Sequence, residues 1–287
     1  MRKFFALAAS LLVIAEFGFS GTFAIKLGSG LGYISGGDFA KGIRGWSDYY
    51  ADVYDSLRGE FLAPHFGMNL SAEVIYYFKP NMGLGLSTGY ARYARGSEAS
   101  YDLGYVSSTE QFKPKISVIP ITANFHYLLP LRPKLTLDLA AGASLYFASL
   151  SWDYTMNLTL LGYSGSDQFT YSAARGGIGF QAGAGAEYEL SSAISVVLNI
   201  TARYASIAKF QGDWTEKGSG NIWDFSDSGS NIYAWYYDWK FNETSYPQIA
   251  FQDERPTGTT VSNSRYARLG LTGFVATFGV KIRLPFR

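Results

Sequence analysis

Apolar side chains alternate with small or polar ones over long stretches of this chain, and this period of two constrains the fold more than any other feature. From Phe23 to Tyr33, aromatic and branched residues fall on one face, while glycines and Lys26 fall on the other. Successive side chains of a β-strand point to opposite faces, so the pattern predicts strands. It recurs at residues 66–78, 82–90, 119–129, 135–147, 178–190, 194–204 and 274–286. The chain is therefore predicted to be all-β, with about eight strands.

The connections between these strands are of two kinds. Three are short turns, at residues 79–81, 130–133 and 191–193. Four are long, at residues 35–64, 96–114, 151–174 and 211–265. Ordinary domains have connections of about 4–6 residues, whereas transmembrane barrels combine short periplasmic turns with long extracellular loops. We therefore predict a transmembrane antiparallel up-and-down β-barrel of about eight strands with long extracellular loops.

The alternation alone does not say which face lies inside. In a soluble ligand-binding barrel the apolar face would line the interior and residues such as Lys26 and Glu73 would face water. The unequal loops favour the opposite arrangement, as does a polar face rich in Gly and Ser, which suits a tightly filled lumen. Closed barrels also leave no unpaired backbone groups in lipid.

The first residues have the layout of a cleavable export signal. Arg2 and Lys3 precede an apolar stretch from Phe4 to Ile14, and small residues follow. We expect cleavage between residues 20 and 24, which gives a signal peptide at residues 1–22 and an outer-membrane β-barrel at residues 23–287. The protein would then belong to a Gram-negative outer membrane.

Charge and cysteine content exclude several classes of function. The chain has 24 basic and 23 acidic residues, and a net charge of only +1 offers no electrostatic attraction to nucleic acid. It has no cysteine, which excludes disulfides and thiolate metal or redox sites. The acidic stretch at residues 224–231 lacks the ligand spacing of a calcium loop. We expect no cofactor and no metal.

Charged residues on the inward face of the predicted strands form the first candidate site. The lumen of an eight-stranded barrel is just wide enough for side chains to fill, and charges there must pair. We predict a salt-bridged plug rather than an aqueous pore, formed by Lys26, Glu73, His126, Asp138, Glu187, Arg203, Lys281 and Arg283. The alternative is a role in conducting protons or solutes.

Basic residues where strands emerge into the long loops form a second candidate site. At the height of the outer-leaflet head groups, their side chains could pair with lipopolysaccharide phosphates. This predicted collar comprises Arg92, Arg95, Lys115, Arg175, Lys209, Arg265 and Arg268. The alternative is that strand rims simply tolerate long charged side chains.

All six tryptophans fall in or at the start of the long connections. Tryptophan is enriched in binding hot spots, which makes a surface for an extracellular protein or glycan one interpretation. The candidate residues are Trp214, Trp223, Trp235 and Trp239. The alternation from Tyr233 to Phe241 favours the other interpretation, an extracellular hairpin whose aromatic side chains pack on other loops.

No local motif of a hydrolase or metalloenzyme occurs, since G-x-S-x-G, H-E-x-x-H and Walker sequences are absent. The two histidines, His65 and His126, have no nucleophile beside them in the sequence. We therefore expect no catalytic residues. Lipid-A modification stays open as an alternative, because distant residues can assemble a catalytic triad.

Two segments resemble the small bacterial outer-membrane barrels, the group that includes OmpX, OmpW and the OmpA membrane domain. They are residues 73–86, EVIYYFKPNMGLGL, and residues 278–286, FGVKIRLPF. The resemblance implies insertion by the barrel assembly machinery, which reads an aromatic residue near the end, here Phe286. It also implies, for the OmpW type, passive transport of small apolar molecules through a lateral opening. Our first expectation is a non-enzymatic surface scaffold that acts in envelope integrity or surface interaction.

Overall fold

A computed structural model describes residues 21–284 of the protein. The predicted signal peptide falls almost entirely outside these residues, and so does Phe286. Within the described part, the first strand already begins at Thr22.

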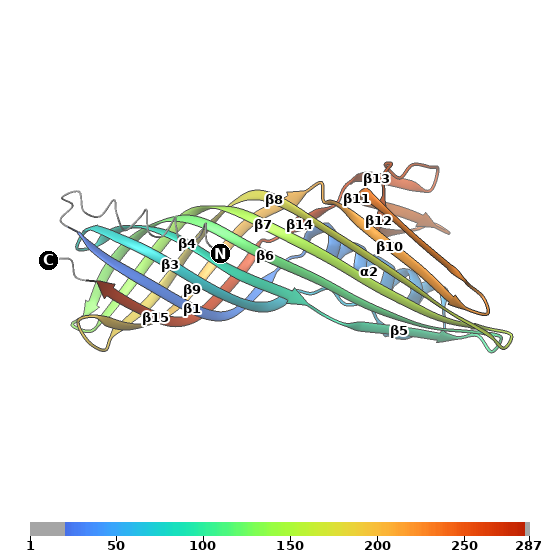
Figure 1. Ribbon diagram of the computed structural model, residues 1–287, viewed down its shortest axis with the longest axis horizontal. Coiled ribbons are helices and arrows are strands. Elements are labelled where there is room, and N and C mark those ends of the chain that lie inside the picture. The colour runs from blue at the N-terminus through green and yellow to red at the C-terminus, as the bar shows by residue number, and fades with distance from the viewer. Residues whose placement is uncertain (1–20, 285–287) are drawn as a thin grey trace.

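Eight antiparallel strands close into a ring within residues 21–284. In order around the ring they are β1 (Thr22–Ile34), β3 (Phe66–Lys79), β4 (Met82–Ala94), β6 (Val106–Arg132), β7 (Leu135–Leu160), β8 (Tyr163–Glu189), β9 (Ile194–Ala208) and β15 (Gly273–Leu284). The ring closes because β15 pairs with both β9 and β1. Figure 1 shows the ring on the left, with the short turns at its left-hand end, away from the long strands that leave the ring. The predicted barrel of eight strands is confirmed.

The ring has an apolar exterior and a polar interior. Met68, Ile178 and Tyr204 each have 68% of their surface exposed, although they are large and hydrophobic. Inward-facing polar side chains such as Asp138 and Lys281 are almost completely buried. This distribution is the reverse of that in a soluble protein and matches a barrel that spans lipid.

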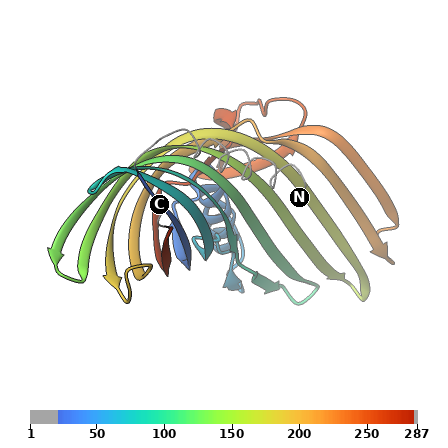
Figure 2. The same ribbon diagram turned by 60° about the vertical axis from the view of Figure 1, so that its left-hand side comes forward.

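Three strands continue far beyond the ring. A strand needs only about 9–11 residues to cross a bilayer, but β6, β7 and β8 have 26 or 27 residues each. Figure 2 shows these long green and yellow strands extending beyond the barrel. Shorter strands join their sheet: β2 (Arg58–Glu60), β5 (Ser97–Asp102), β10 (Gln211–Gly220), β11 (Phe225–Phe241), β12 (Thr244–Gln252) and β13 (Val261–Tyr266). A last short strand, β14 (Arg268–Gly270), pairs with the end of β9.

We call the part beyond the ring the extension. It corresponds to the four predicted long loops, and most of it is regular structure. The hairpin predicted within residues 211–265 is present as β11 and β12. The physical reason is that the long strands β6 and β8 pair with β5 and β10, and these pair in turn with β2 and β11, which satisfies the backbone groups of the added strands.

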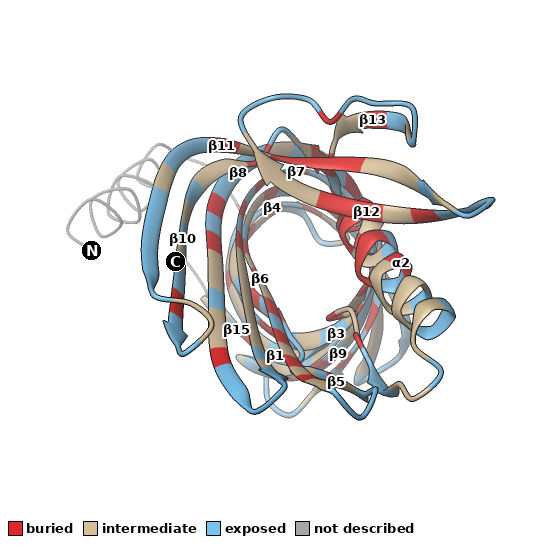
Figure 3. Ribbon diagram, turned by 90° about the vertical axis from the view of Figure 1, so that its right-hand side faces the viewer, coloured by how far each residue is buried: buried red, intermediate tan, exposed pale blue. Residues whose placement is uncertain are grey.

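A helix, α2 (Gly37–Val53), lies in the segment predicted as the first loop. It packs against the sheet through Gly42 and Gly45, where an added Cβ atom would collide with the Ile249 side chain and with the Pro247 carbonyl oxygen. Figure 3 looks onto the extension and shows α2 beside β12, with buried residues on the side toward the sheet. The two glycines therefore permit a close approach that any larger residue would prevent.

No helix among residues 21–284 is long and apolar enough to cross a membrane.

Candidate functional site

A hydrogen-bonded ion pair crosses the barrel from wall to wall. Nζ of Lys26 lies 3.3 Å from Oδ2 of Asp138. Lys26 is on β1 and Asp138 is on β7, and these two strands stand opposite each other in the ring of eight. Lys26 also donates to Oδ1 of Asn199 on β9 at 2.9 Å. A contact between opposite walls leaves little open cross-section at this level.

His126 lies between two carboxylates in the same layer. Its Nδ1 is 2.9 Å from Oδ1 of Asp138, and its Nε2 is 3.0 Å from Oε1 of Glu73. The same Glu73 oxygen accepts a hydrogen bond from the Asn124 amide at 2.6 Å. His126 and Asp138 each have only 1% of their side chain exposed. The imidazole thus links β3, β6 and β7 through buried polar contacts.

A second cluster lies nearer the turns. Nζ of Lys281 is 2.8 and 2.7 Å from the two oxygens of Glu187, and it also donates to the Tyr77 hydroxyl at 2.7 Å. Lys281 is fully buried, and Glu187 is 1% exposed. Arg283 lies 3.9 Å from Glu187 and pairs more closely with Glu189, at 3.1 Å. We call both clusters together the lower closure: Lys26, Glu73, Tyr77, His126, Asp138, Glu187 and Lys281.

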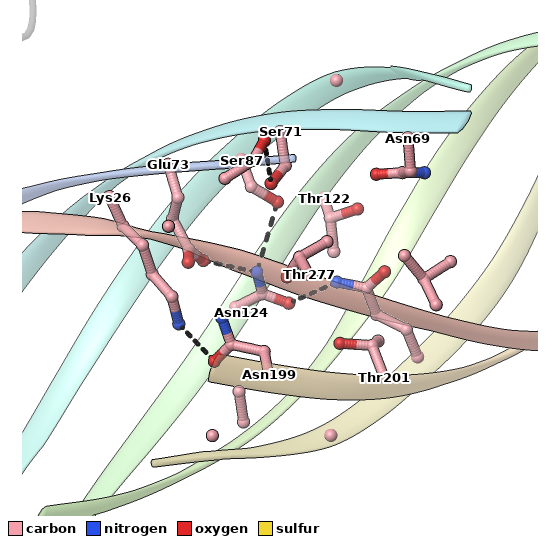
Figure 4. Close-up of a pocket in the computed structure, with 18 of the residues that line it drawn as sticks. Lys26, Asn69, Ser71, Glu73, Ser87, Thr122, Asn124, Asn199, Thr201 and Thr277 are labelled. Carbon is pink, nitrogen blue, oxygen red and sulfur yellow. Dashed lines mark hydrogen bonds between the residues drawn. The ribbon is translucent and has the colours of Figure 1, made fainter. Parts of the chain in front are cut away.

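A small polar chamber of about 100 Å³ lies on the extension side of the lower closure, whose residues Glu73, His126 and Asp138 form part of its wall. Figure 4 shows Asn124 at its centre, bonded to Glu73 and Ser87, and its oxygen accepts from Gln181 at 3.1 Å. A separate hollow of about 560 Å³ opens at the turns and is lined by Tyr77 and Arg283. The two hollows share no lining residue. The lower closure lies between them.

The structure brings seven of the eight predicted lumen residues into ion pairs. Arg203 is the exception, because it lines the upper part of the chamber and interacts with Tyr93 instead of a carboxylate. Asn124, Asn199, Gln181 and Tyr77 belong to the network but were not among the predicted residues. The alternation of side chains along their strands could have indicated that these four residues point into the barrel.

The extension end of the barrel is filled by apolar side chains. Tyr93 and Tyr146 are fully buried there, and α2 inserts Phe39, which is 2% exposed. The Phe39 ring meets Phe210 edge-on at 5.7 Å and Trp152 at 6.2 Å. All five residues belong to or pack against one buried cluster to which β1, β4, β6, β7, β8 and β9 also contribute. We call these five residues the upper closure.

The seven predicted collar residues lie in or beside β4, β6, β8, β9, β13 and β14, toward the extension. Arg92, Arg95, Arg175, Lys209 and Arg268 are exposed, and Lys115 is half-buried. Arg265 differs, because its Nη2 binds Oδ1 of Asp38 on α2 at 2.8 Å and its guanidinium lies 4.1 Å from the Tyr236 ring centre. Arg265 therefore connects α2 to strands β11 and β13 within the extension.

The four predicted surface tryptophans are packed against other side chains. Trp235 is buried and stacks on Tyr266 at 4.3 Å. Trp214 stacks on Phe169 at 6.2 Å, and Trp239 meets Tyr49 of α2 at 4.9 Å. Trp223 is half-buried and covers Gly165. These contacts correspond to the hairpin-packing interpretation, in which the tryptophans build the extension.

An aromatic cavity of about 220 Å³ lies inside the extension. Its wall is almost entirely apolar, and two carboxylates complete it. The lining residues are Ile43, Trp46, Phe61, Phe112, Trp152, Tyr154, Asp167, Phe169, Glu216, Ile249 and Phe251. Burial raises the pKa of Asp167, and burial followed by the nearby Asp167 charge raises the pKa of Glu216. Neither carboxylate was among the predicted site residues.

Acidic side chains should make the extension more stable at lower pH. Burial raises the pKa of Glu110, as it does for Asp167 and Glu216, so the folded extension holds protons that the unfolded chain has already released. Stability from such groups falls as pH rises from the ordinary carboxyl range, about 4, through their raised pKa values. We expect slower amide hydrogen exchange in α2 at pH 5 than at pH 8, after correction for intrinsic exchange. The control is the triple variant Glu110→Gln, Asp167→Asn and Glu216→Gln, whose exchange should depend less on pH. An equal dependence would contradict this origin.

No group of three or more metal-ligating His, Cys, Asp or Glu side chains occurs among residues 21–284.

No protein-family model matches the sequence, and no curated protein matches it. Three solved structures are distantly similar. The outer membrane protein OprG from Pseudomonas aeruginosa has a TM-score of 0.42 and 10% identity, over 93% of this chain and 97% of that one. A major outer membrane protein from Thermus thermophilus has a TM-score of 0.38 and 15% identity, over 92% and 100%. The outer membrane protease OmpT from Escherichia coli has a TM-score of 0.30 and 10% identity, over 94% and 98%.

The eight-strand ring rests on the strand pairings themselves and not on these overlaps. The chain is an antiparallel β-barrel with a distant structural similarity to outer-membrane proteins.

Proposed function

We propose that the chain is a non-enzymatic barrel of a Gram-negative outer membrane that displays the extension at the cell surface. The observation that carries this proposal is that side chains close the barrel twice, by ion pairs below and by aromatic packing above. A filled barrel is suited to anchoring. The material outside the ring is a folded sheet with an apolar cluster of its own around Ile43, Phe61 and Phe112, so it is suited to interaction with the surroundings.

The charged rim supports this orientation. Arg92, Arg175 and Arg268 are exposed where the apolar belt ends on the side of the extension. Guanidinium groups bind phosphate oxygens in a bidentate manner. We propose that the collar pairs with lipopolysaccharide phosphates, that the extension is extracellular, and that the barrel assembly machinery inserts the chain.

The surroundings of the two histidines support a non-enzymatic role. His126 is buried in the lower closure with a carboxylate at each ring nitrogen, far along its strand from the extension. His65 has its Nδ1 2.9 Å from the carbonyl oxygen of Ile34 and stacks on Tyr33. Neither arrangement offers a nucleophile. The extension would instead bind an extracellular protein, a glycan or a small ligand.

Conductance in planar lipid bilayers tests whether the barrel is closed. We expect the refolded wild-type protein to show no steady conductance, while an open porin in the same membrane conducts. Arg203→Ala is the matched control, because it removes a lumen charge but leaves the ion pairs of the lower closure and the packing of Phe39 in place, and it should remain silent. Glu73→Ala combined with Phe39→Ala weakens both closures, and we expect openings there.

A steady conductance in the wild type would overturn the scaffold proposal. Transport of small molecules would then be the better function. Silence of the double variant, with native refolding shown by its unheated gel mobility, would place the closure in other residues.

A further inference from the structure

We propose that the aromatic cavity of the extension binds a compact organic ammonium ion, held between its ring faces and the carboxylates of Asp167 and Glu216. The inference rests on the proposed function, because it assigns a ligand to the displayed extension.

The cavity is made from elements that are far apart in the chain. Residues of α2, β6, β7, β8, β10 and β12 line it, and ring-to-ring contacts fix the wall. Trp152 lies 4.5 Å from Phe112 and 5.2 Å from Phe251, while Trp46 lies 5.9 Å from Tyr154. Because each ring is held by neighbours, the wall is preformed, which lowers the entropic cost of binding.

The size of the cavity limits the ligand. In another protein an apolar cavity of about 150 Å³ holds one benzene molecule. The cavity here measures about 220 Å³, enough for one ring with a short substituent. A larger drug-like molecule would need the wall to move.

The charge of the cavity selects a cation. Its lining contains two carboxylates and no basic side chain. Glu216 pairs with Phe169 across β8 and β10, which places Asp167 as its diagonal neighbour on the same face of the sheet. Asp227 of β11 lies opposite Glu216 and adds further negative charge. Aromatic faces attract cations as well, so both parts of the wall favour the same ligand.

Two observations mark the carboxylates as incompletely satisfied. Oδ1 of Asp167 is buried and makes no hydrogen bond within the described residues. Burial, the charge of Asp167 and a hydrogen bond between the two side chains raise the pKa of Glu216. An ammonium group between them would supply hydrogen-bond donors and remove the repulsion. Both carboxylates are only half-buried, so this end of the cavity reaches solvent and gives the ligand an entrance.

Titration with a matched pair of probes tests the inference. Benzylammonium and benzyl alcohol have nearly the same size and differ in charge. The full-length protein in zwitterionic lipid nanodiscs would be titrated with each, with tryptophan fluorescence and calorimetry as readouts and empty nanodiscs as the blank. Because a charge-assisted hydrogen bond is stronger than a neutral one, we expect benzylammonium to bind about tenfold more tightly. Trp46 and Trp152 should report the binding, and Trp46→Phe should reduce the fluorescence change.

Substitutions of the carboxylates locate the site. Asp167→Asn with Glu216→Gln should remove the preference, so that the two probes bind within about threefold of each other. The charge-matched control, Asp224→Asn with Glu254→Gln, neutralises two exposed acids outside the cavity and should keep the preference. If the double variant does not refold, Glu216→Gln alone is tested in the same way, and it should also reduce the preference for benzylammonium.

Equal binding of the two probes by the wild type, or an unchanged preference in the double variant, would overturn the inference. These outcomes are separate from the conductance result. A silent barrel that ignores benzylammonium would contradict only the ligand, whereas a conducting barrel that binds it would contradict only the scaffold.

Discussion

Replacing Lys281 by alanine should lower the free energy of unfolding by about 3–5 kcal/mol, because it leaves the buried Glu187 carboxylate without its main partner. Lys281 is fully buried and makes both of its Glu187 contacts at 2.8 Å or less. The remaining cation near Glu187 is Arg283, at 3.9 Å. Urea unfolding in lipid vesicles, followed by tryptophan fluorescence and by the gel mobility of unheated samples, measures the loss.

The matched control is Arg283→Ala in the same strand. The Arg283 side chain is 26% exposed, and its partner Glu189 is 37% exposed, so water screens their attraction. Exposed pairs contribute about 0–1 kcal/mol, and we expect a loss in that range.

A second variant tests whether the loss comes from the unpaired Glu187 carboxylate and the lost volume or from the ion pair itself. Lys281→Met with Glu187→Gln removes both charges but keeps the volume, and it should recover most of the stability lost in Lys281→Ala. Similar losses in Lys281→Ala and Arg283→Ala would show that the Lys281 pair contributes little. No recovery in the double variant would contradict this explanation, because neither an unpaired charge nor lost volume remains there, and the ion pair itself would then be the stabilising element.

The ring could be predicted from the sequence because its signal is local. Alternation within each strand fixes which side chains point inward, and this placed Lys26, Asp138 and Lys281 inside the barrel. The local pattern does not say which of the inward residues contact each other across the barrel. Lys26 reaches Asp138 because β1 and β7 stand opposite each other, a relation set by strand number and stagger. Arg203 faces inward as well, but its height places it beside Tyr93.

The extension could not be predicted in the same way. Outside the lipid belt neither face of a strand has to be apolar, so the alternation fades along the outer halves of β7 and β8. In α2 the spacing of Phe39, Ile43, Trp46 and Tyr50 follows a helical period, but Gly42 and Gly45 weaken the helical signal. Those glycines are explained only by the contact with β12, some 200 residues away. The aromatic cavity depends on the same contact.

Replacing Phe39 by alanine should detach α2 from the mouth of the barrel without unfolding the ring. The ring is stabilised by its own strand pairing, whereas α2 is fixed by side-chain packing in which Phe39 is 2% exposed. Truncation of a buried Phe to Ala costs about 3–5 kcal/mol, because the ring is lost and a cavity remains. We expect this cost to lower the free energy of local unfolding of α2 and not that of the ring, since parts of a protein can unfold as separate units.

Hydrogen exchange resolves this local effect. We expect amides of α2 in Phe39→Ala to exchange about 150- to 4000-fold faster than in the wild type, since 1.4 kcal/mol corresponds to a factor of ten. Amides of the ring strands β1 and β15 should keep their rates. Phe225→Ala is the control, because Phe225 is 40% exposed on β11 and a surface substitution of this kind changes stability by about 0.5 kcal/mol or less. If the ring amides exchanged faster together with α2, the upper closure would be part of one cooperative unit with the barrel, and the extension could not be treated as a separate module.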